Sequence, residues 1–227
     1  MPSAWRPSLW RVQAVRMQIG GWKHVCVRFT RYNVTLVSIR TGYLVNNPHT
    51  VRLLLLAPSP DNHTYPNPRW TRVLPLTRAA IFTAGHWFFH EMQPPPLDQM
   101  QSTFTLTRDH LHHSNYTGRA LALSFSPAHT RKSCAAATAP LPASRPDAAL
   151  ASVTTESTMP ALSAQRRALQ ESRLRLVDVT KMSRFRPDAH LRRNSGLGKL
   201  DCSHWCLPGV PDTWSNLIVS HLLGRLE

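Results

Sequence analysis

The last third of the chain alternates between apolar strand-like runs and helix-forming stretches, and this alternation restricts the fold more than any other feature. An apolar run at residues 174–179 follows a segment of good helix formers at 161–173. Residues 214–226 carry apolar side chains at helical spacing, which predicts a closing amphipathic helix. Because strands that alternate with helices along a chain usually form a parallel sheet, we predict an α/β sandwich whose sheet is mostly parallel.

The rest of the chain carries weaker strand and helix signals. Its 227 residues suit one sizeable domain, and we assign residues 22–227 to it and leave 1–21 unassigned. The stretch 131–160 is rich in Ala, Ser, Thr and Pro without periodicity, and it predicts a mobile loop or insertion at about 130–160. The other expected elements are one or two strands in 22–45, a strand or short helix at 51–57, a loop at 58–68, a strand within 73–87, a short helix in 97–111, a strand at 120–125 and a loop at 192–199.

The chain is strongly basic, with 27 Lys and Arg against 12 Asp and Glu and a net charge of +15. Such a balance suggests nucleic-acid binding, since neutralised phosphates release counterions. The arginines are nevertheless scattered along the chain and form no basic run. We therefore expect no nucleic-acid partner, and we attribute the composition first to GC-rich coding sequence and second to a surface that attracts acidic glycans.

The four cysteines Cys26, Cys134, Cys202 and Cys206 are compatible with two disulfides in an oxidising compartment. Cys202 and Cys206 flank His204, but no nearby fourth ligand completes a zinc site, so no metal is expected. The pairing is open: Cys202 and Cys206 could join each other, Cys134 or Cys26. Three Asn-x-Ser/Thr sequons, at Asn33, Asn62 and Asn115, also favour a secretory lumen.

No segment predicts a membrane anchor, because arginines interrupt the first 20 residues and no run of ~18 apolar residues occurs. A lumenal protein needs such a segment or a signal peptide. We therefore expect either a cytosolic chain or one whose N-terminal part is missing.

The pair Asp201 and His204 is the strongest catalytic candidate. An Asp three residues before a His on a loop can turn back and accept a hydrogen bond from the imidazole Nδ1–H. That bond fixes the tautomer and leaves Nε2 free to take a proton from a serine. Trp205 can exclude water, and prolines and disulfides on either side can stiffen the loop.

Three other groups of side chains have both a catalytic and a structural interpretation. Gly85, His86 and Trp87 follow a predicted buried strand, where they either shape the pocket or form a turn with an aromatic plug. The loop 180–190 contains Arg186 and Asp188, which we expect to pair and to hold the loop shape rather than to catalyse. The histidine cluster is expected to be a solvated loop rather than a metal site; it comprises His110, His112 and His113.

Four blocks of sequence in this order resemble the trichome-birefringence-like family of plant cell-wall polysaccharide O-acetyltransferases. The fourth is the longest and most specific match, and coverage extends from about Trp22 to the C-terminus. The blocks are Arg31-Tyr32-Asn33-Val34-Thr35 with Tyr43-Leu44-Val45, Ala80 to Trp87, Ser124-Phe125-Ser126-Pro127-Ala128-His129 with Ser133-Cys134, and Asp178 to His190 followed by Asp201 to Trp214.

The resemblance implies an SGNH/GDSL-esterase-like three-layer α/β sandwich, incomplete here at its N-terminus, and a Golgi location with an N-terminal membrane anchor that this chain does not show. It also implies a Ser-His-Asp triad in which Asp201 orients His204 and His204 is the general base. An acetyl donor supplies the group that passes through serine to a hydroxyl of a cell-wall polysaccharide such as xylan. No bound cofactor or metal is implied.

The family's serine lies in a Gly-Asp-Ser block, and no Gly-Asp-Ser occurs in these 227 residues. We therefore expect a truncated gene model or a degenerate paralogue. Two hypotheses follow. The chain is an O-acetyltransferase family member that is active only when a longer native chain supplies the serine, or it is an inactive lumenal glycan-binding or scaffolding remnant.

Overall fold

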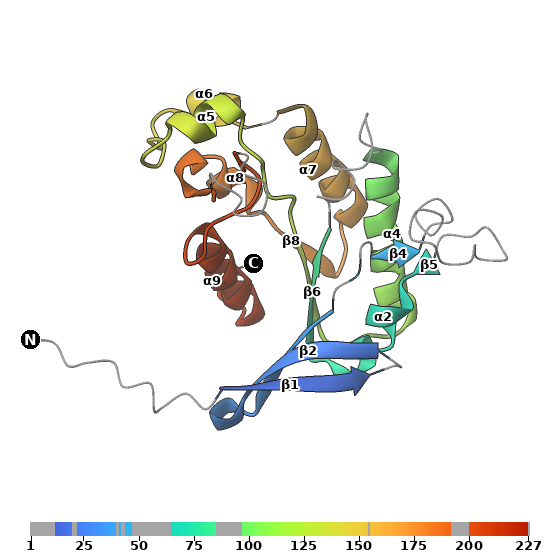
Figure 1. Cartoon of the computed structure of the whole chain (residues 1–227). Coiled ribbons are helices and arrows are strands. Elements are labelled where there is room, and N and C mark those ends of the chain that lie inside the picture. Colours follow the sequence, from blue (N-terminus) through green and yellow to red (C-terminus); the bar gives the residue numbers. More distant parts are fainter. Residues whose placement is uncertain are drawn as a thin grey trace, which may run out of the picture. The chain divides into compact units, whose positions relative to one another are not determined.

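The computed structural model describes residues 12–19, 22–39, 41, 44–46, 65–84, 97–153, 155–191 and 200–226. The chain consists of two compact units, Met1–Thr77 and Arg78–Glu227. Figure 1 shows the elements of both units.

The first unit contains an antiparallel three-stranded sheet in the order β1-β2-β3. Alternating β-branched and aromatic residues give β2 and β3, as predicted, whereas β1 lies in the segment that the sequence left unassigned. A second feature is a long-range hydrogen bond, in which the Trp70 indole Nε1–H donates to the Leu44 carbonyl at 2.6 Å. The elements are β1 (Val12–Ile19), β2 (Trp22–Phe29), η2 (Thr30–Tyr32), β3 (Val34–Ser38), β4 (Val45–Asn46), β5 (Tyr65–Pro66), α2 (Pro68–Thr71) and η3 (Leu74–Leu76).

The second unit is built on a parallel sheet in the order β6-β7-β8, formed by β6 (Ala79–Thr83), β7 (Arg119–Leu123) and β8 (Leu174–Val177). The central strand β7 has the sequence Arg-Ala-Leu-Ala-Leu, and its side chains alternate between the two faces of the sheet. Leu121 packs with Val177 and Val179 and with apolar residues of the C-terminal helix α9 (Val210–Leu222). The prediction of an α/β fold with a parallel sheet is confirmed in this unit.

Helices cover both faces of this sheet (Figure 1). α9 lies on one face, while α4 (Leu97–His113) and α7 (Thr155–Leu169) lie on the other. The Arg108 guanidinium on α4 donates to the Ala168 carbonyl on α7 at 3.0 Å and ties the pair together. Four short helices lie in the connections: α5 (Arg131–Ala136), α6 (Pro146–Ala151), α8 (Thr180–Ser183) and η4 (Pro187–Ala189).

Helix α9 begins at Val210, four residues before the predicted start, because the Asp212 carboxylate accepts a hydrogen bond from the Gly209 backbone N–H at 2.5 Å. We expect Asp212→Ala to lower the free energy of unfolding by about 1 kcal/mol, since an N-terminal amide of the helix loses its acceptor. Urea unfolding followed by circular dichroism measures the change. Ser215→Ala, on the same helix and exposed, is the control and should alter stability by less than half as much.

The largest difference from the predicted elements is in 130–160, where the structure contains α5, α6 and the first turns of α7. Local capping explains the first two, because Thr130 accepts from the Ser133 amide at the start of α5 and Pro146 opens α6. α7 includes Pro160 and ends at Leu169 rather than at 173.

Smaller differences concern the ends of other elements. The predicted strand in 73–87 is strand only at β6, and η3 precedes it. Helix α4 extends past 111 to His113. The predicted elements at 51–57 and 192–199 lie outside the described residues.

Among the described residues, no helix is both long enough and apolar enough to cross a membrane.

Candidate functional site

The carboxyl ends of β7 and β8 are joined by a buried hydrogen-bond network. The Ser124 hydroxyl oxygen, directly after β7, accepts from the Val179 and Thr180 amides at 2.8 and 3.1 Å. The Thr180 hydroxyl donates back to the Phe125 carbonyl at 2.6 Å. Asp178 accepts from the Thr180 amide at 3.0 Å and pairs with Arg166 of α7 at 2.7 Å. These bonds fix the edge of the sheet at which α/β proteins usually place ligand sites.

Gln165, fully buried on α7, connects the ends of β6 and β7. Its amide oxygen accepts from the Phe125 backbone N–H at 2.8 Å, and its amide nitrogen donates to the Ala84 carbonyl at 3.5 Å. The side chain therefore joins a buried amide and a part-buried carbonyl that lie just past the strand ends.

We expect Gln165→Leu to lower the free energy of unfolding by about 2 kcal/mol, because the buried Phe125 amide loses this acceptor and the part-buried Ala84 carbonyl loses this donor. Urea titration provides the measurement. Arg167→Leu is the control, since Arg167 is exposed on the same helix, and it should cost less than half as much. An equal loss in both variants would show that Gln165 contributes only through helix packing.

The Asp201–His204 loop has the local geometry that its sequence predicts. The His204 imidazole Nδ1 lies 2.7 Å from Asp201 Oδ2. Asp201 Oδ1 accepts from the Ser203 and His204 amides and from the Ser203 hydroxyl, each at 3.0 Å. The His204 side chain is 71% exposed and that of Asp201 only 9%. Within the described part of the chain, no hydrogen bond reaches His204 Nε2, so this nitrogen faces outward with its acceptor site open.

The Asp201 carboxylate is held in its ionised form by its surroundings. Burial alone would raise its pKa, but the hydrogen bonds from the His204 and Ser203 amides and from both side chains outweigh burial. Together they hold the pKa of Asp201 well below its usual range. The negative charge of this carboxylate beside Nδ1 favours the Nδ1–H tautomer and stabilises an imidazolium, which is what a general base requires.

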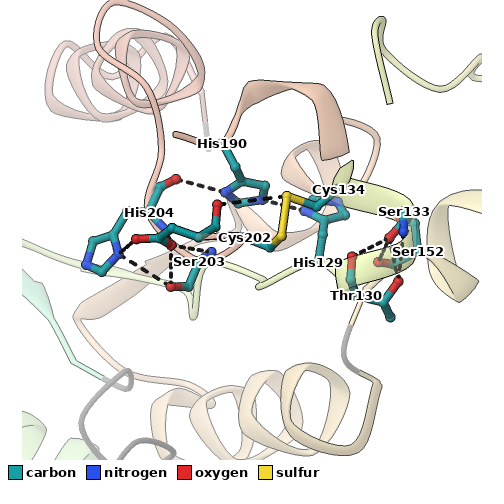
Figure 2. The surroundings of a disulfide bond; sticks show 10 residues. His129, Thr130, Ser133, Cys134, Ser152, His190, Cys202, Ser203 and His204 are labelled. Carbon is teal, nitrogen blue, oxygen red and sulfur yellow. Dashed lines mark hydrogen bonds and ion pairs between the residues drawn. A yellow bond between two sulfur atoms is a disulfide. The ribbon is translucent and has the colours of Figure 1, made fainter. Parts of the chain in front are cut away.

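The loop is anchored to the rest of the unit by a disulfide and by Trp205. Cys202 is bonded to Cys134 of α5, with their Cα atoms 5.8 Å apart (Figure 2). The Trp205 indole N–H donates to the Ser126 hydroxyl at 3.3 Å, so the loop lies against the segment that leaves β7. Of the four cysteines, all in the described part of the chain, Cys206 is a free thiol. The second disulfide with which the even count is compatible is therefore absent from the described residues.

The other predicted site residues have different outcomes. Gly85, His86 and Trp87 lie outside the described residues, and their pocket-shaping role stays a prediction. Arg186 and Asp188 form the predicted pair, with two hydrogen bonds of 3.0 Å.

The histidine cluster is not a loop. His110, His112 and His113 form the last turn of α4, where basic side chains are favoured by the helix dipole. Within the residues that the structure describes, no three His, Cys, Asp or Glu side chains gather as a metal ion would require.

Sequence reasoning missed Gln165 and the contact between His129 and His190. A glutamine on a helix gives no sequence signal of its partners. The two histidines were each quoted within a sequence block, but a separation of 61 residues gives no signal that their rings meet.

A comparison with protein-family models finds a match at residues 96–221, just over half of the chain, to PC-Esterase, the "GDSL/SGNH-like Acyl-Esterase family found in Pmr5 and Cas1p". The chain belongs to this family. The matched residues of this PC-esterase chain include the carboxyl ends of β7 and β8, the disulfide and the Asp201–His204 loop.

The chain is also similar to trichome birefringence-like proteins of Arabidopsis thaliana, as its sequence blocks predicted. Trichome birefringence-like 38 is 29% identical over 86% of this chain and 55% of its own length. Trichome birefringence-like 40 is 56% identical over 21% of this chain and 13% of its own length. The PC-esterase chain thus spans about half the length of the first of these relatives. No solved structure matches it.

Proposed function

We propose that this PC-esterase chain carries the acid–base part of an O-acetyltransferase that acts on plant cell-wall polysaccharide in the Golgi lumen. The observation that carries the proposal is the Asp201–His204 contact at 2.7 Å, with His204 exposed and its Nε2 open. Family membership and the location of both residues within the matched segment support it.

The reaction requires a serine hydroxyl and an acetyl donor. His204 Nε2 takes the proton as the serine oxygen attacks the acetyl carbonyl, and it gives that proton to the leaving donor as the acyl-serine forms. A sugar hydroxyl then attacks the acyl-serine while His204 takes its proton. The proton returns to the serine oxygen as the acyl bond breaks, which leaves an acetylated sugar. Asp201 stays ionised and stabilises the imidazolium in both steps.

The Gly-Asp-Ser block in which the family's serine lies does not occur in these 227 residues. The Ser203 hydroxyl is next to His204, but it lies 3.4 Å from Nδ1, which is the ring nitrogen already hydrogen-bonded to Asp201. It therefore cannot pass a proton to Nε2. The proposal places the nucleophile in a Gly-Asp-Ser block encoded outside this sequence.

Sequencing the native transcript upstream of the Met1 codon tests this proposal, together with an assay of its product. We expect an in-frame Gly-Asp-Ser block, and we expect the product to transfer labelled acetyl to xylo-oligosaccharide. A stop codon upstream of Met1 in every transcript, or a full-length product that transfers no acetyl to any wall glycan, would overturn the proposal.

A second candidate function is a glycan-binding remnant without catalysis, favoured by the absence of Gly-Asp-Ser and by the net charge of +15. This candidate predicts that the 227-residue chain binds glucuronic-acid-substituted xylan more tightly than neutral xylan, and that salt weakens the binding. Affinity electrophoresis in gels that contain one or the other xylan compares the two affinities. Equal retention by both gels would exclude the charge-based form of this candidate.

A further inference from the structure

Two buried histidines lie behind the Asp201–His204 loop. His129 follows β7 and His190 follows η4, and they are 3% and 2% exposed. Their rings meet edge to face, with His129 Nδ1 2.7 Å from His190 Nε2 (Figure 2). Since a hydrogen bond between two imidazoles requires one protonated and one bare nitrogen, this contact couples the tautomers of the two rings.

The outer nitrogens of the pair face backbone carbonyls. His129 Nε2 lies 3.1 Å from the Arg184 carbonyl, and His190 Nδ1 lies 2.9 Å from the His204 carbonyl. Carbonyls only accept, so the three contacts together require three ring protons. Two neutral imidazoles carry two protons, and the pair reaches three only by taking up one positive charge.

The His190 side is connected directly to the loop of His204. The Leu191 amide donates to the same His204 carbonyl at 3.2 Å, and the Cys206 amide donates to the Ala189 carbonyl at 3.0 Å. The Trp205 ring lies over His190 with centroids 4.1 Å apart. The segment 189–191 therefore holds the segment 204–206 by backbone bonds, ring contact and the His190 hydrogen bond.

The charge state of the pair is set by burial and by nearby charges. Burial is the largest influence and lowers the pKa of both rings, that of His129 to about 4. The carbonyls of Arg184 and His204 act in the opposite direction, as do the carboxylates of Asp188 and Asp201. The His204 imidazole lowers the pKa of His190, and the Asp188 charge is shared with the Arg186 guanidinium. Burial therefore favours the neutral pair, which has two ring protons for its three contacts.

We propose that His129 and His190 are positioning residues that hold the backbone of His204 as one neutral pair, and that uptake of a single proton by the pair releases it. Any effect of this release on the general base His204 rests on the proposed function, whereas the release of the backbone does not. The direction of the pH dependence follows from linkage. A ring that becomes solvated when the loop opens titrates near pH 6.5, above its pKa in the closed loop. The contact between the neutral pair and the His204 backbone is therefore fully formed above pH 6.5 and is lost as the pH falls toward 4.

Hydrogen exchange of the 227-residue chain, measured by NMR between pH 7 and pH 4.5, tests the proposal. After correction for intrinsic exchange rates, we expect the protection of the Leu191 and Cys206 amides to fall about tenfold per pH unit below pH 6.5. The Ser124 amide, bonded to the Val177 carbonyl at 3.0 Å, is the internal control and should stay protected. Equal losses at Ser124 would indicate global unfolding and would overturn a local release.

Two further readouts separate proton uptake from a merely structural role. In ¹⁵N-histidine spectra, the rings of His129 and His190 should titrate together in one step. His190→Asn keeps an N–H donor for the His204 carbonyl, but His129 can still titrate in that variant. In the double variant His129→Asn with His190→Asn neither position titrates, so its Leu191 protection should be independent of pH. His112→Gln, at the exposed end of α4, should behave as the wild type.

Two separate ring titrations, or protection that falls with pH in the double variant as in the wild type, would overturn the proposal. Neither readout involves acetyl transfer, so failure of the proposed function would leave both results unchanged.

Discussion

Replacing Asp201 with asparagine should reverse the tautomer of His204 and lower acetyl transfer by about 10³- to 10⁴-fold. The asparagine oxygen can still accept from the Ser203 and His204 amides, as Oδ1 of Asp201 does at 3.0 Å. Its NH₂ group takes the position of Oδ2 and donates to Nδ1, which forces the proton onto Nε2. A ring protonated at Nε2 cannot accept the proton of a serine.

The tautomer is measured from ¹⁵N shifts of the His204 ring in the 227-residue chain, and the transfer rate in the product of the native transcript. Ser203→Ala is the matched control, since it removes one hydrogen bond to Asp201 Oδ1 and leaves the hydrogen bond between Asp201 Oδ2 and His204 Nδ1 in place. It should keep the tautomer and most of the rate. Residues that act as a unit are not additive, so Asp201→Asn should cost little in a His204→Ala background. A full additional loss there would remove Asp201 from the role of orienting His204.

The sequence predicted contacts between residues that lie close together in the chain. Asp201 and His204 are three residues apart, so a single turn brings the carboxylate to the ring. The same holds for Arg186 and Asp188. The parallel sheet was predictable because strand and helix patterns alternate, and Leu121 and Val177 lie on β7 and β8 as expected.

The contacts that the sequence did not predict join residues that are distant in the chain. The disulfide partner of Cys202 was one of three open choices, because spacing does not determine which cysteines meet in space. The His129–His190 contact and the bridging role of Gln165 depend on how the loops pack after the strands are placed. Helices in 130–160 were missed because the cap Thr130 and the first-turn proline Pro146 lie within a composition that otherwise indicates a loop.

Removing the Cys134–Cys202 disulfide should produce the largest loss of stability, because it closes a loop with a sequence separation of 68 residues. The chain entropy of closing such a loop corresponds to about 4 kcal/mol in the free energy of unfolding. The double variant Cys134→Ser with Cys202→Ser should lose about this amount in urea unfolding. Wild-type protein in dithiothreitol should unfold like the variant, and dithiothreitol should not change the variant further.

The loop of Asp201 should be affected before the rest of the fold. The Asp201 carbonyl lies 3.8 Å from Cys134 Sγ, and the Cys202 carbonyl accepts from the His129 amide at 2.9 Å. Releasing Cys202 therefore loosens both contacts of the backbone that carries the carboxylate, and the Nδ1–H signal of His204 should broaden in the double variant. Cys206→Ser is the control, because its thiol lies outside the disulfide. If Cys206→Ser destabilised the protein as much as the double variant, then Cys206, rather than Cys134, would be the partner of Cys202.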